Sequence, residues 1–365
     1  MKISAARAIF VLSALLLLGS LAFVAGQTKS PASEEAGYKK PDSGYHLLKT
    51  YMFGAAPGST TEYFDYVTVD AAARRVYLSR GTAVQVMDAD SGASLGVISG
   101  FTRQHGVALA PEFNRGFISD GTAAKIIMFD LKTLKTVGEA KADPDTDCMV
   151  YDPASKNVFS MNGDGHSSTV VNAKTGEVVK TIALSGLPEF AVADGKGMLY
   201  ANIADKNEIA AIDTRALAVK ASWPVAPAGG PTALAIDAAH RRLFSAGRNP
   251  QMLVILDADS GKVIQSFPIT AGTDAAAYDP DSGIIFVSTT EGNIHIFHED
   301  SPDKYSIVDT VKTQYGAKTM GFDSKTHRLF LDTADFSAPA APPAGGRGGR
   351  PAAVPGTFRV LVYGR

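Results

Sequence analysis

One pattern recurs along this chain at intervals of about 42 residues: a short apolar strand, a polar turn and a second apolar strand. The clearest copy is LAIDAAHRRLFS, in which Asp237 ends the first strand. Successive copies are separated by 40, 42, 42, 43, 42 and 44 residues. The residues that end the first strand in the seven copies are Asp70, Ala110, Asp152, Asp194, Asp237, Asp279 and Asp323. A regular period of this length indicates a repeat architecture.

Each unit contains four predicted strands. In residues 231–269 they are TALAID, RRLFSAG, MLVILD and KVIQSFPI, and turns rich in Gly, Pro, Asp and Ser separate them. The turn between the third and fourth strands also recurs at the same period, as DADSG at Asp88 and again at Asp257. A four-stranded unit has two apolar faces and cannot bury both alone, so it needs copies on either side. The sequence therefore predicts an all-β fold, a seven-bladed β-propeller of four-stranded antiparallel blades.

The two ends of the chain predict how the ring closes. Residues 45–53, YHLLKTYMF, read as a strand without a unit of its own, whereas the last unit supplies only three strands. We expect the N-terminal strand to pair in the C-terminal blade, because closure removes an exposed sheet edge. The propeller is predicted to span 45–365. Within it, residues 334–356 are rich in Pro, Gly and Ala and are predicted to form a disordered loop in the last blade.

The N-terminus predicts export. Residues 1–26 combine Lys2 and Arg7 with an apolar run and the small residues Val24-Ala25-Gly26, which is typical of a secretory signal peptide. The alternative is an uncleaved membrane anchor, but the run of roughly 17 apolar residues is at the short end for a span. Residues 27–44 are polar and are predicted to be a flexible linker. We expect a periplasmic or secreted protein with no membrane span after cleavage.

Composition limits the partners. The formal net charge is −2, and it becomes −4 without Lys2 and Arg7. Because no basic cluster is present, no nucleic-acid partner is expected. A single cysteine, Cys148, excludes an internal disulfide, and no CxxCH motif for covalent haem occurs. We expect a monomer without a cofactor, whose partner is a small molecule or an envelope protein.

Blade connectivity predicts where a site lies. In an up-and-down blade, the loop that enters the first strand and the loop between the second and third strands lie on one face, here called the upper face. Loops at such mouths commonly bind ligands. The predicted ligand-binding residues on this face are His105, Asp147, Glu189, Arg248, Asp274 and Lys318. Tyr63, Phe64 and Asp65 enter from the same face. Alternatively, each carboxylate accepts backbone N–H bonds in its own turn, as we expect of the recurrent aspartates on the lower face.

Catalytic and metal-binding alternatives use the same face. A hydrolase would use His105 or a funnel carboxylate to activate water, with Arg103 or Arg248 holding an anionic substrate or a developing oxyanion. No GxSxG motif indicates covalent acyl chemistry. His105 and His166 are the alternative metal ligands, because mixed nitrogen and oxygen ligands suit a divalent ion, although no HxH or HExxH spacing occurs.

Several stretches resemble a known family. HGVALAPEFNRGFIS from His105, DPASKNVFSMNG from Asp152 and AIDAAHRRLFSAG from Ala235 are similar to the YVTN-repeat, YncE-like propellers of bacterial envelopes. The resemblance covers the whole predicted domain. It implies an exported seven-bladed propeller that binds a ligand or partner without an assigned reaction. The same superfamily includes sequences similar to bacterial lactonases. We therefore expect a binding protein rather than an enzyme, with a lactonase-type hydrolase of small cyclic esters as the alternative.

Overall fold

The computed structural model has its described residues in one compact unit, Pro41–Arg365. It describes residues 42–338 and 351–365. The predicted signal peptide, most of the predicted linker and the middle of the predicted loop at 334–356 therefore lie outside the described residues. Within the described part, helical structure is limited to two single-turn 3-10 helices, η1 (Pro111–Phe113) and η2 (Ala204–Lys206). No helix in that part has the length and hydropathy needed to cross a membrane.

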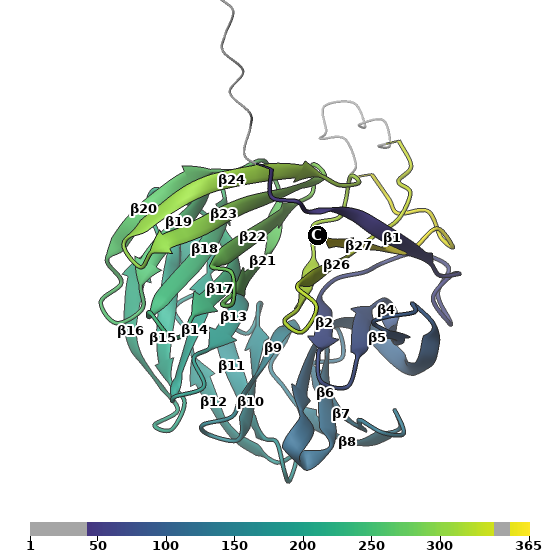
Figure 1. Ribbon diagram of the computed structural model, residues 1–365. Coiled ribbons are helices and arrows are strands. Elements are labelled where there is room, and N and C mark those ends of the chain that lie inside the picture. Colours follow the sequence, from purple (N-terminus) through teal and green to yellow (C-terminus); the bar gives the residue numbers. More distant parts are fainter. Residues whose placement is uncertain (1–41, 339–350) are drawn as a thin grey trace, which may run out of the picture. The chain divides into compact units, whose positions relative to one another are not determined.

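The strands of the described residues form six antiparallel sheets (Figure 1). The sheet that joins the two ends of the chain has the order β1 (His46–Met52), β27 (Arg359–Gly364), β26 (Arg328–Thr333) and β25 (Met320–Asp323). A seven-stranded sheet follows in chain order: β2 (Val67–Asp70), β3 (Arg75–Ser79), β4 (Gly81–Asp88), β5 (Ser94–Ala110), β6 (Arg115–Asp120), β7 (Lys125–Asp130) and β8 (Thr136–Lys141).

The other four sheets contain four consecutive strands each. The first two of them are β9 (Thr146–Asp152), β10 (Asn157–Asn162), β11 (Ser167–Asn172) and β12 (Val178–Ala183), then β13 (Pro188–Ala193), β14 (Met198–Ile203), β15 (Glu208–Asp213) and β16 (Ala218–Pro224). The last two are β17 (Pro231–Asp237), β18 (Arg242–Arg248), β19 (Gln251–Asp257) and β20 (Val263–Pro268), then β21 (Thr273–Asp279), β22 (Ile284–Thr289), β23 (Asn293–Ser301) and β24 (Lys304–Lys312).

The first strands of successive units contact one another in a closed series. β2 contacts β25 and β5, β5 contacts β9, and the series continues through β13, β17 and β21 back to β25. In Figure 1, β2, β9, β13, β17 and β21 of this series lie nearest the common centre of the sheets, and β12, β16, β20 and β24 lie at the periphery. Four-stranded antiparallel sheets in this arrangement form a β-propeller, as the all-β repeat predicted.

The N-terminal strand pairs in the C-terminal sheet, as the sequence predicted. β1 runs antiparallel to β27, with His46 opposite Gly364 and Met52 opposite Arg359. Tyr45, just before β1, is buried and packs edge-on against Phe286 at a centroid distance of 4.9 Å. The outer edge of β27 is thereby covered by the other end of the chain.

The core lies between neighbouring sheets. The second strand of every repeat carries one fully buried aromatic side chain near its start. These side chains are Tyr77, Phe117, Phe159, Tyr200, Phe244, Phe286 and Phe330. Phe244, for example, packs with Ile285 and Phe297 of the next sheet. Burying an aromatic side chain contributes about 2 kcal/mol, so this repeat position is a main source of stability.

The aspartates of the lower face organise turns, as the sequence predicted. Asp194 Oδ1 accepts backbone N–H bonds from Lys196, Gly197 and Met198 at 2.7, 3.0 and 2.9 Å. Equivalent bonds to the backbone or a nearby hydroxyl are made by Asp70, Asp152, Asp237, Asp279 and Asp323. Such bonds fix the turn between the first and second strands.

Three of these aspartates also join neighbouring repeats. The partner is the residue before the second strand of an adjacent repeat, where the backbone is left-handed with φ between 55° and 59°. The pairs are Arg74 Nη1 with Asp323 Oδ2 at 2.7 Å, Arg241 Nη1 with Asp194 Oδ2 at 2.7 Å, and His327 Nδ1 with Asp279 Oδ2 at 2.9 Å. The lower face is therefore a structural network.

The flanks of the predicted disordered loop are paired with each other. Phe336 bridges Ala353, and the Ser337 N–H donates to the carbonyl of Ala352 at 2.9 Å. The Phe336 ring also contacts Phe64 and Tyr315. Because the flanks are paired, the prediction of a disordered loop now applies only to the residues between them. These contacts also bring the flanks to the upper face.

Candidate functional site

One repeat position supplies most of the polar side chains of the candidate site. It lies five residues before the residue that ends each first strand. The seven residues at this position, which we name the entry ring, are Asp65, His105, Asp147, Glu189, Thr232, Asp274 and Lys318. Because the first strands lie next to one another around the centre, equivalent positions come together although 253 residues separate Asp65 from Lys318.

A β-bulge accompanies this position in five repeats. The pairing between first and second strands shifts register at or beside His105, Asp147, Glu189, Thr232 and Asp274. A bulge adds one residue to a strand and re-aims its side chain, and bulges are frequent next to active sites. The neighbouring backbones approach closely here, since a Cβ on Gly106 would lie 2.9 Å from the Asp147 carbonyl oxygen. The bulges therefore orient the side chains of the entry ring.

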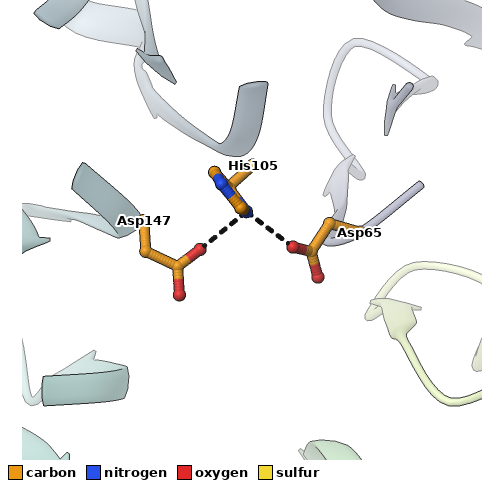
Figure 2. Close-up of side chains that lie close together, drawn as sticks. All are labelled: Asp65, His105 and Asp147. Carbon is orange, nitrogen blue, oxygen red and sulfur yellow. Dashed lines mark hydrogen bonds and ion pairs between the residues drawn. The ribbon is translucent and has the colours of Figure 1, made fainter. Parts of the chain in front are cut away.

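Three members of the entry ring converge on one nitrogen atom (Figure 2). His105 Nδ1 lies 2.8 Å from Asp65 Oδ2 and 3.2 Å from Asp147 Oδ1. The His105 side chain is only 6% exposed, and the side chains of Asp65 and Asp147 are 12% and 19% exposed. Figure 2 shows the two carboxylates on opposite sides of the imidazole edge. We refer to Asp65, His105 and Asp147 as the Asp–His–Asp cluster.

Two tyrosines surround this cluster. The Tyr63 hydroxyl donates to Asp65 Oδ2 at 2.8 Å and lies 3.0 Å from His105 Nδ1. The Tyr66 hydroxyl donates to Asp147 Oδ2 at 3.2 Å. In the described residues, the cluster carboxylates thus accept hydrogen bonds from side chains only, whereas the turn aspartates of the lower face also accept backbone N–H bonds.

Burial and neighbouring charges separate the titrations of the cluster. Burial raises the pKa of Asp147, the Asp65 charge raises it further, and the value is about 7. Burial also opposes ionisation of Asp65, but the hydrogen bond to His105 and the Lys318 charge outweigh it and lower the pKa of Asp65. For His105, burial lowers the pKa, whereas Asp65 and Asp147 raise it by more, so the net shift is upward. The pKa values of Asp65 and Asp147 are therefore shifted in opposite directions, although both carboxylates face the same imidazole ring.

The other charged members of the entry ring interact with one another and with Arg248. Asp274 forms ion pairs with both Arg248 and Lys318, and Arg248 Nε donates to the Thr273 carbonyl at 3.0 Å. Burial raises the pKa of Glu189 to about 8, and the charges of Asp147 and Asp274 add to the effect. Burial lowers the pKa of Lys318, but Asp274 and Asp65 outweigh it and the net shift is upward. The ring carries more carboxylates than cations.

A cavity of about 1180 Å³ opens beside the ring. Its lining includes Tyr63, Phe64, Arg103, Arg248, Tyr315, Lys318 and Phe336. The Arg103 guanidinium lies 5.1 Å from the centre of the Tyr63 ring, a cation–π distance. The paired flanks at 336–337 and 351–355 form one wall. Cations and aromatic side chains therefore share one concave surface.

The structure places the predicted site residues in two groups. His105 and Asp147 contact each other, and Asp274 contacts Arg248 and Lys318; Glu189 is coupled to both groups through charge. Arg103, the alternative catalytic residue, lines the cavity. His166, the alternative metal ligand, is exposed in the turn between β10 and β11. Within the described residues it belongs to no group of converging metal-ligand atoms.

Sequence reasoning gave too little weight to Asp65 and overlooked Tyr66. Asp65 stands in the entry segment Tyr63-Phe64-Asp65, where the sequence alone does not rank one polar residue above another. Counting five residues back from each turn selects Asp65 and the other six members of the ring. No comparable signal marks Tyr66, because its hydroxyl reaches Asp147 of a different repeat.

Fold and site together define a β-propeller with a charged entry ring. No family model matches the sequence, and no curated protein matches it. Among solved structures, the chain is similar to one titled Kuenenia stuttgartiensis Hydrazine Synthase, with a TM-score of 0.66 and 13% sequence identity. The match covers 76% of this chain and 96% of that chain. At this identity the similarity shows the fold alone, and it supports the β-propeller.

Proposed function

We propose that this protein is a β-propeller binding protein that takes up a small organic anion in the cavity beside the entry ring. The observation that carries the proposal is the set of three cations, Arg103, Arg248 and Lys318, that line the cavity. Arg248 and Lys318 share Asp274, whereas Arg103 forms no ion pair with a carboxylate in the described part of the chain. A guanidinium without a carboxylate partner suits an incoming anion, since arginine binds carboxylates through two parallel hydrogen bonds.

The rest of the lining suggests the body of the ligand. Tyr63, Phe64, Tyr315 and Phe336 contribute aromatic surface to the cavity. Ligand sites commonly combine an apolar lining with a few polar groups that fix orientation. An aromatic carboxylate satisfies both features, with its ring against the aromatic side chains and its carboxylate at Arg103.

We further propose a seven-blade count and the family suggested by the repeats. The long β5 would end one blade through Ser94 to Ser99, which pair with β4, and begin the next through Val107 to Ala110, which pair with β6. The seven entry-ring residues and seven buried aromatics support this count. Membership of the YVTN-repeat, YncE-like propellers, export to the periplasm or beyond, and a small molecule or an envelope protein as partner are proposals carried by the repeat sequence and the leader.

The binding proposal is tested with aromatic carboxylates. We expect benzoate, phenylacetate or phthalate to raise the melting temperature and to bind in calorimetry, whereas the matching neutral amides do not. Arg103→Ala should weaken binding at least about tenfold, because a charge-assisted hydrogen bond is worth about 1.5–3 kcal/mol. Arg215→Ala removes an exposed arginine from the lower face and should leave binding unchanged. Absence of binding by the whole panel, or unchanged binding by Arg103→Ala, would refute the proposal.

Lactone-hydrolysis assays on the same protein distinguish a binding protein from the alternative, a hydrolase. A binding protein leaves γ-butyrolactone and δ-valerolactone intact. Turnover of either lactone that is abolished in His105→Ala and retained in Arg215→Ala would instead identify a lactonase-type hydrolase at the funnel.

A further inference from the structure

The Asp–His–Asp cluster contains two largely buried carboxylates that have no lysine or arginine partner in the described residues. Among the described residues, neither Asp65 nor Asp147 forms an ion pair with a lysine or an arginine, and the only cationic group in contact is His105. In the described part of the chain, neither carboxylate accepts a backbone N–H bond; their hydrogen bonds come from Tyr63, Tyr66 and the imidazole. Buried carboxylates are normally paired with cations or bound to metal ions.

The hydrogen bonding within the cluster is incomplete. His105 Nδ1 has three oxygen neighbours, from Asp65, Tyr63 and Asp147, at 2.8, 3.0 and 3.2 Å. A single Nδ1–H satisfies only one of them well. Asp147 Oδ1 is buried without a hydrogen-bond partner, and it is one of the atoms that face His105 Nδ1. Folded proteins rarely leave buried polar atoms without a partner, and a bound ion can supply the missing one.

Two other groups of converging metal-ligand atoms differ in the backbone hydrogen bonds that their aspartates accept. They are Asp237, His240 and Glu299, and Asp279, Asp281 and His327. Asp237 accepts backbone N–H bonds from Ala239 and His240. Asp279 accepts one from the Asp281 backbone and pairs with His327 of the next repeat. Asp237 and Asp279 therefore stabilise turns on the lower face, although Glu299 Oε2 is buried without a hydrogen-bond partner. In the described residues, the carboxylates of Asp65 and Asp147 accept no such turn bonds.

The geometry suits a metal ion. The ligand atoms Asp65 Oδ2, His105 Nδ1 and Asp147 Oδ1 lie within 4.8 Å of one another. A tetrahedral zinc site with bonds of about 2.1 Å holds its ligand atoms about 3.4 Å apart. To reach this spacing, the distances from Nδ1 to the two carboxylate oxygens, 2.8 and 3.2 Å, would lengthen by about 0.6 and about 0.2 Å.

We propose that Asp65, His105 and Asp147 bind a divalent transition-metal ion of the zinc or manganese class. The ion would take the place of the Nδ1 proton and would receive one imidazole nitrogen and two carboxylate oxygens. One imidazole and two carboxylates form the mixed set that suits such ions. With three protein ligands, a tetrahedral ion keeps a fourth coordination position for water. This proposal stands independently of the anion proposed for the cavity.

Calorimetry tests the metal site. The protein is treated with EDTA, dialysed and titrated with ZnCl2 and then with MnCl2. We expect one site per chain with a dissociation constant in the micromolar range or below for at least one ion. Asp65→Asn and Asp147→Asn should each weaken binding at least tenfold, because each replaces an anionic ligand by a neutral amide. Glu299→Gln removes one carboxylate from a lower-face group and serves as the matched control, with unchanged affinity.

A second measurement needs no variant. In wild-type crystals soaked in ZnCl2, anomalous diffraction at the zinc edge should give a peak between Asp65, His105 and Asp147. Three results would overturn the proposal: no one-to-one binding of either ion at 100 µM, tight binding that survives both aspartate substitutions, or crystals without a peak at the cluster. A larger loss in Glu299→Gln than in Asp147→Asn would move the site to the lower face and would equally refute it.

Discussion

The two ends of one strand, β13, show how the upper and lower faces of this propeller differ. Glu189, near its start, belongs to the entry ring, and burial raises its pKa to about 8. Asp194, just after its end, belongs to a lower-face turn. Burial raises its pKa too, but bonds from the Met198 and Lys196 N–H groups and from Arg241 outweigh it, and the net shift is downward. Ionisation of Glu189 therefore destabilises the folded protein, whereas ionisation of Asp194 stabilises it.

The same contrast runs around the ring. Lower-face aspartates accept backbone N–H bonds and pair with basic residues of neighbouring repeats, so their charges stabilise the fold. Asp65, Asp147 and Asp274 of the entry ring contact side chains instead, and Asp147 and Glu189 have raised pKa values. Arrangements of this kind cost stability and are typical of sites that bind ligands. Residue type alone therefore does not distinguish structural from functional aspartates in this protein; their hydrogen-bond partners do.

The largest expected difference in the free energy of unfolding is between two isosteric substitutions, one on each face. Asp323→Asn alters a fully buried turn carboxylate that pairs with Arg74 and accepts the Lys325 N–H at 3.1 Å. Breaking a buried charge pair should lower the free energy of unfolding by about 3 kcal/mol. Asp147→Asn, measured in EDTA-treated protein, should lower it by less than about 1 kcal/mol, because Asp147 has no arginine or lysine partner in the described residues. Urea denaturation measures both, and equal losses would remove the distinction between the faces.

A smaller difference is expected between two arginines. Arg241 pairs with Asp194 and Asp259 and donates to the Tyr200 hydroxyl at 2.6 Å. Arg241→Ala should therefore lower the free energy of unfolding by about 2 kcal/mol. Arg103→Ala loses only the contact with Tyr63 and should change it by less than about 0.5 kcal/mol. If Arg103→Ala is the more destabilised variant, Arg103 has a structural role, and the proposal that it binds the anion in the cavity loses its support.

Much of this organisation could be predicted from the sequence, because the repeat fixes both strand order and face. The period placed Asp194 and Asp237 in turns, and connectivity placed His105 and Arg248 with the loops of the other face. Connectivity predicts on which face a residue lies, but it does not predict how deeply the side chain is buried. His166 follows the same rule as Arg248 yet is exposed in its turn, whereas the bulge beside His105 buries the imidazole between two carboxylates.

The cavity wall was harder to predict. Its Pro- and Ala-rich composition indicated a disordered loop, because few side chains in 334–356 can be buried. A single aromatic residue, Phe336, supplies the packing that joins the flanks to Phe64 and Tyr315. Average composition does not reveal one well-placed side chain of this kind.

The central claim, that the entry ring is held at a cost to stability while the lower turns stabilise the fold, is tested most directly by melting curves of Glu189→Gln and Asp194→Asn at pH 8. Folding raises the pKa of Glu189 from 4.5 to about 8, so wild-type stability falls as the pH rises through this range, and glutamine removes that loss. The pKa of Asp194 is lowered below 3.8. Its contribution is therefore present above that value and disappears only as the pH falls through the folded-state pKa. At pH 8 we expect Glu189→Gln to raise the melting temperature by about 2 °C and Asp194→Asn to lower it by a similar amount. A lower melting temperature for both variants would contradict the account.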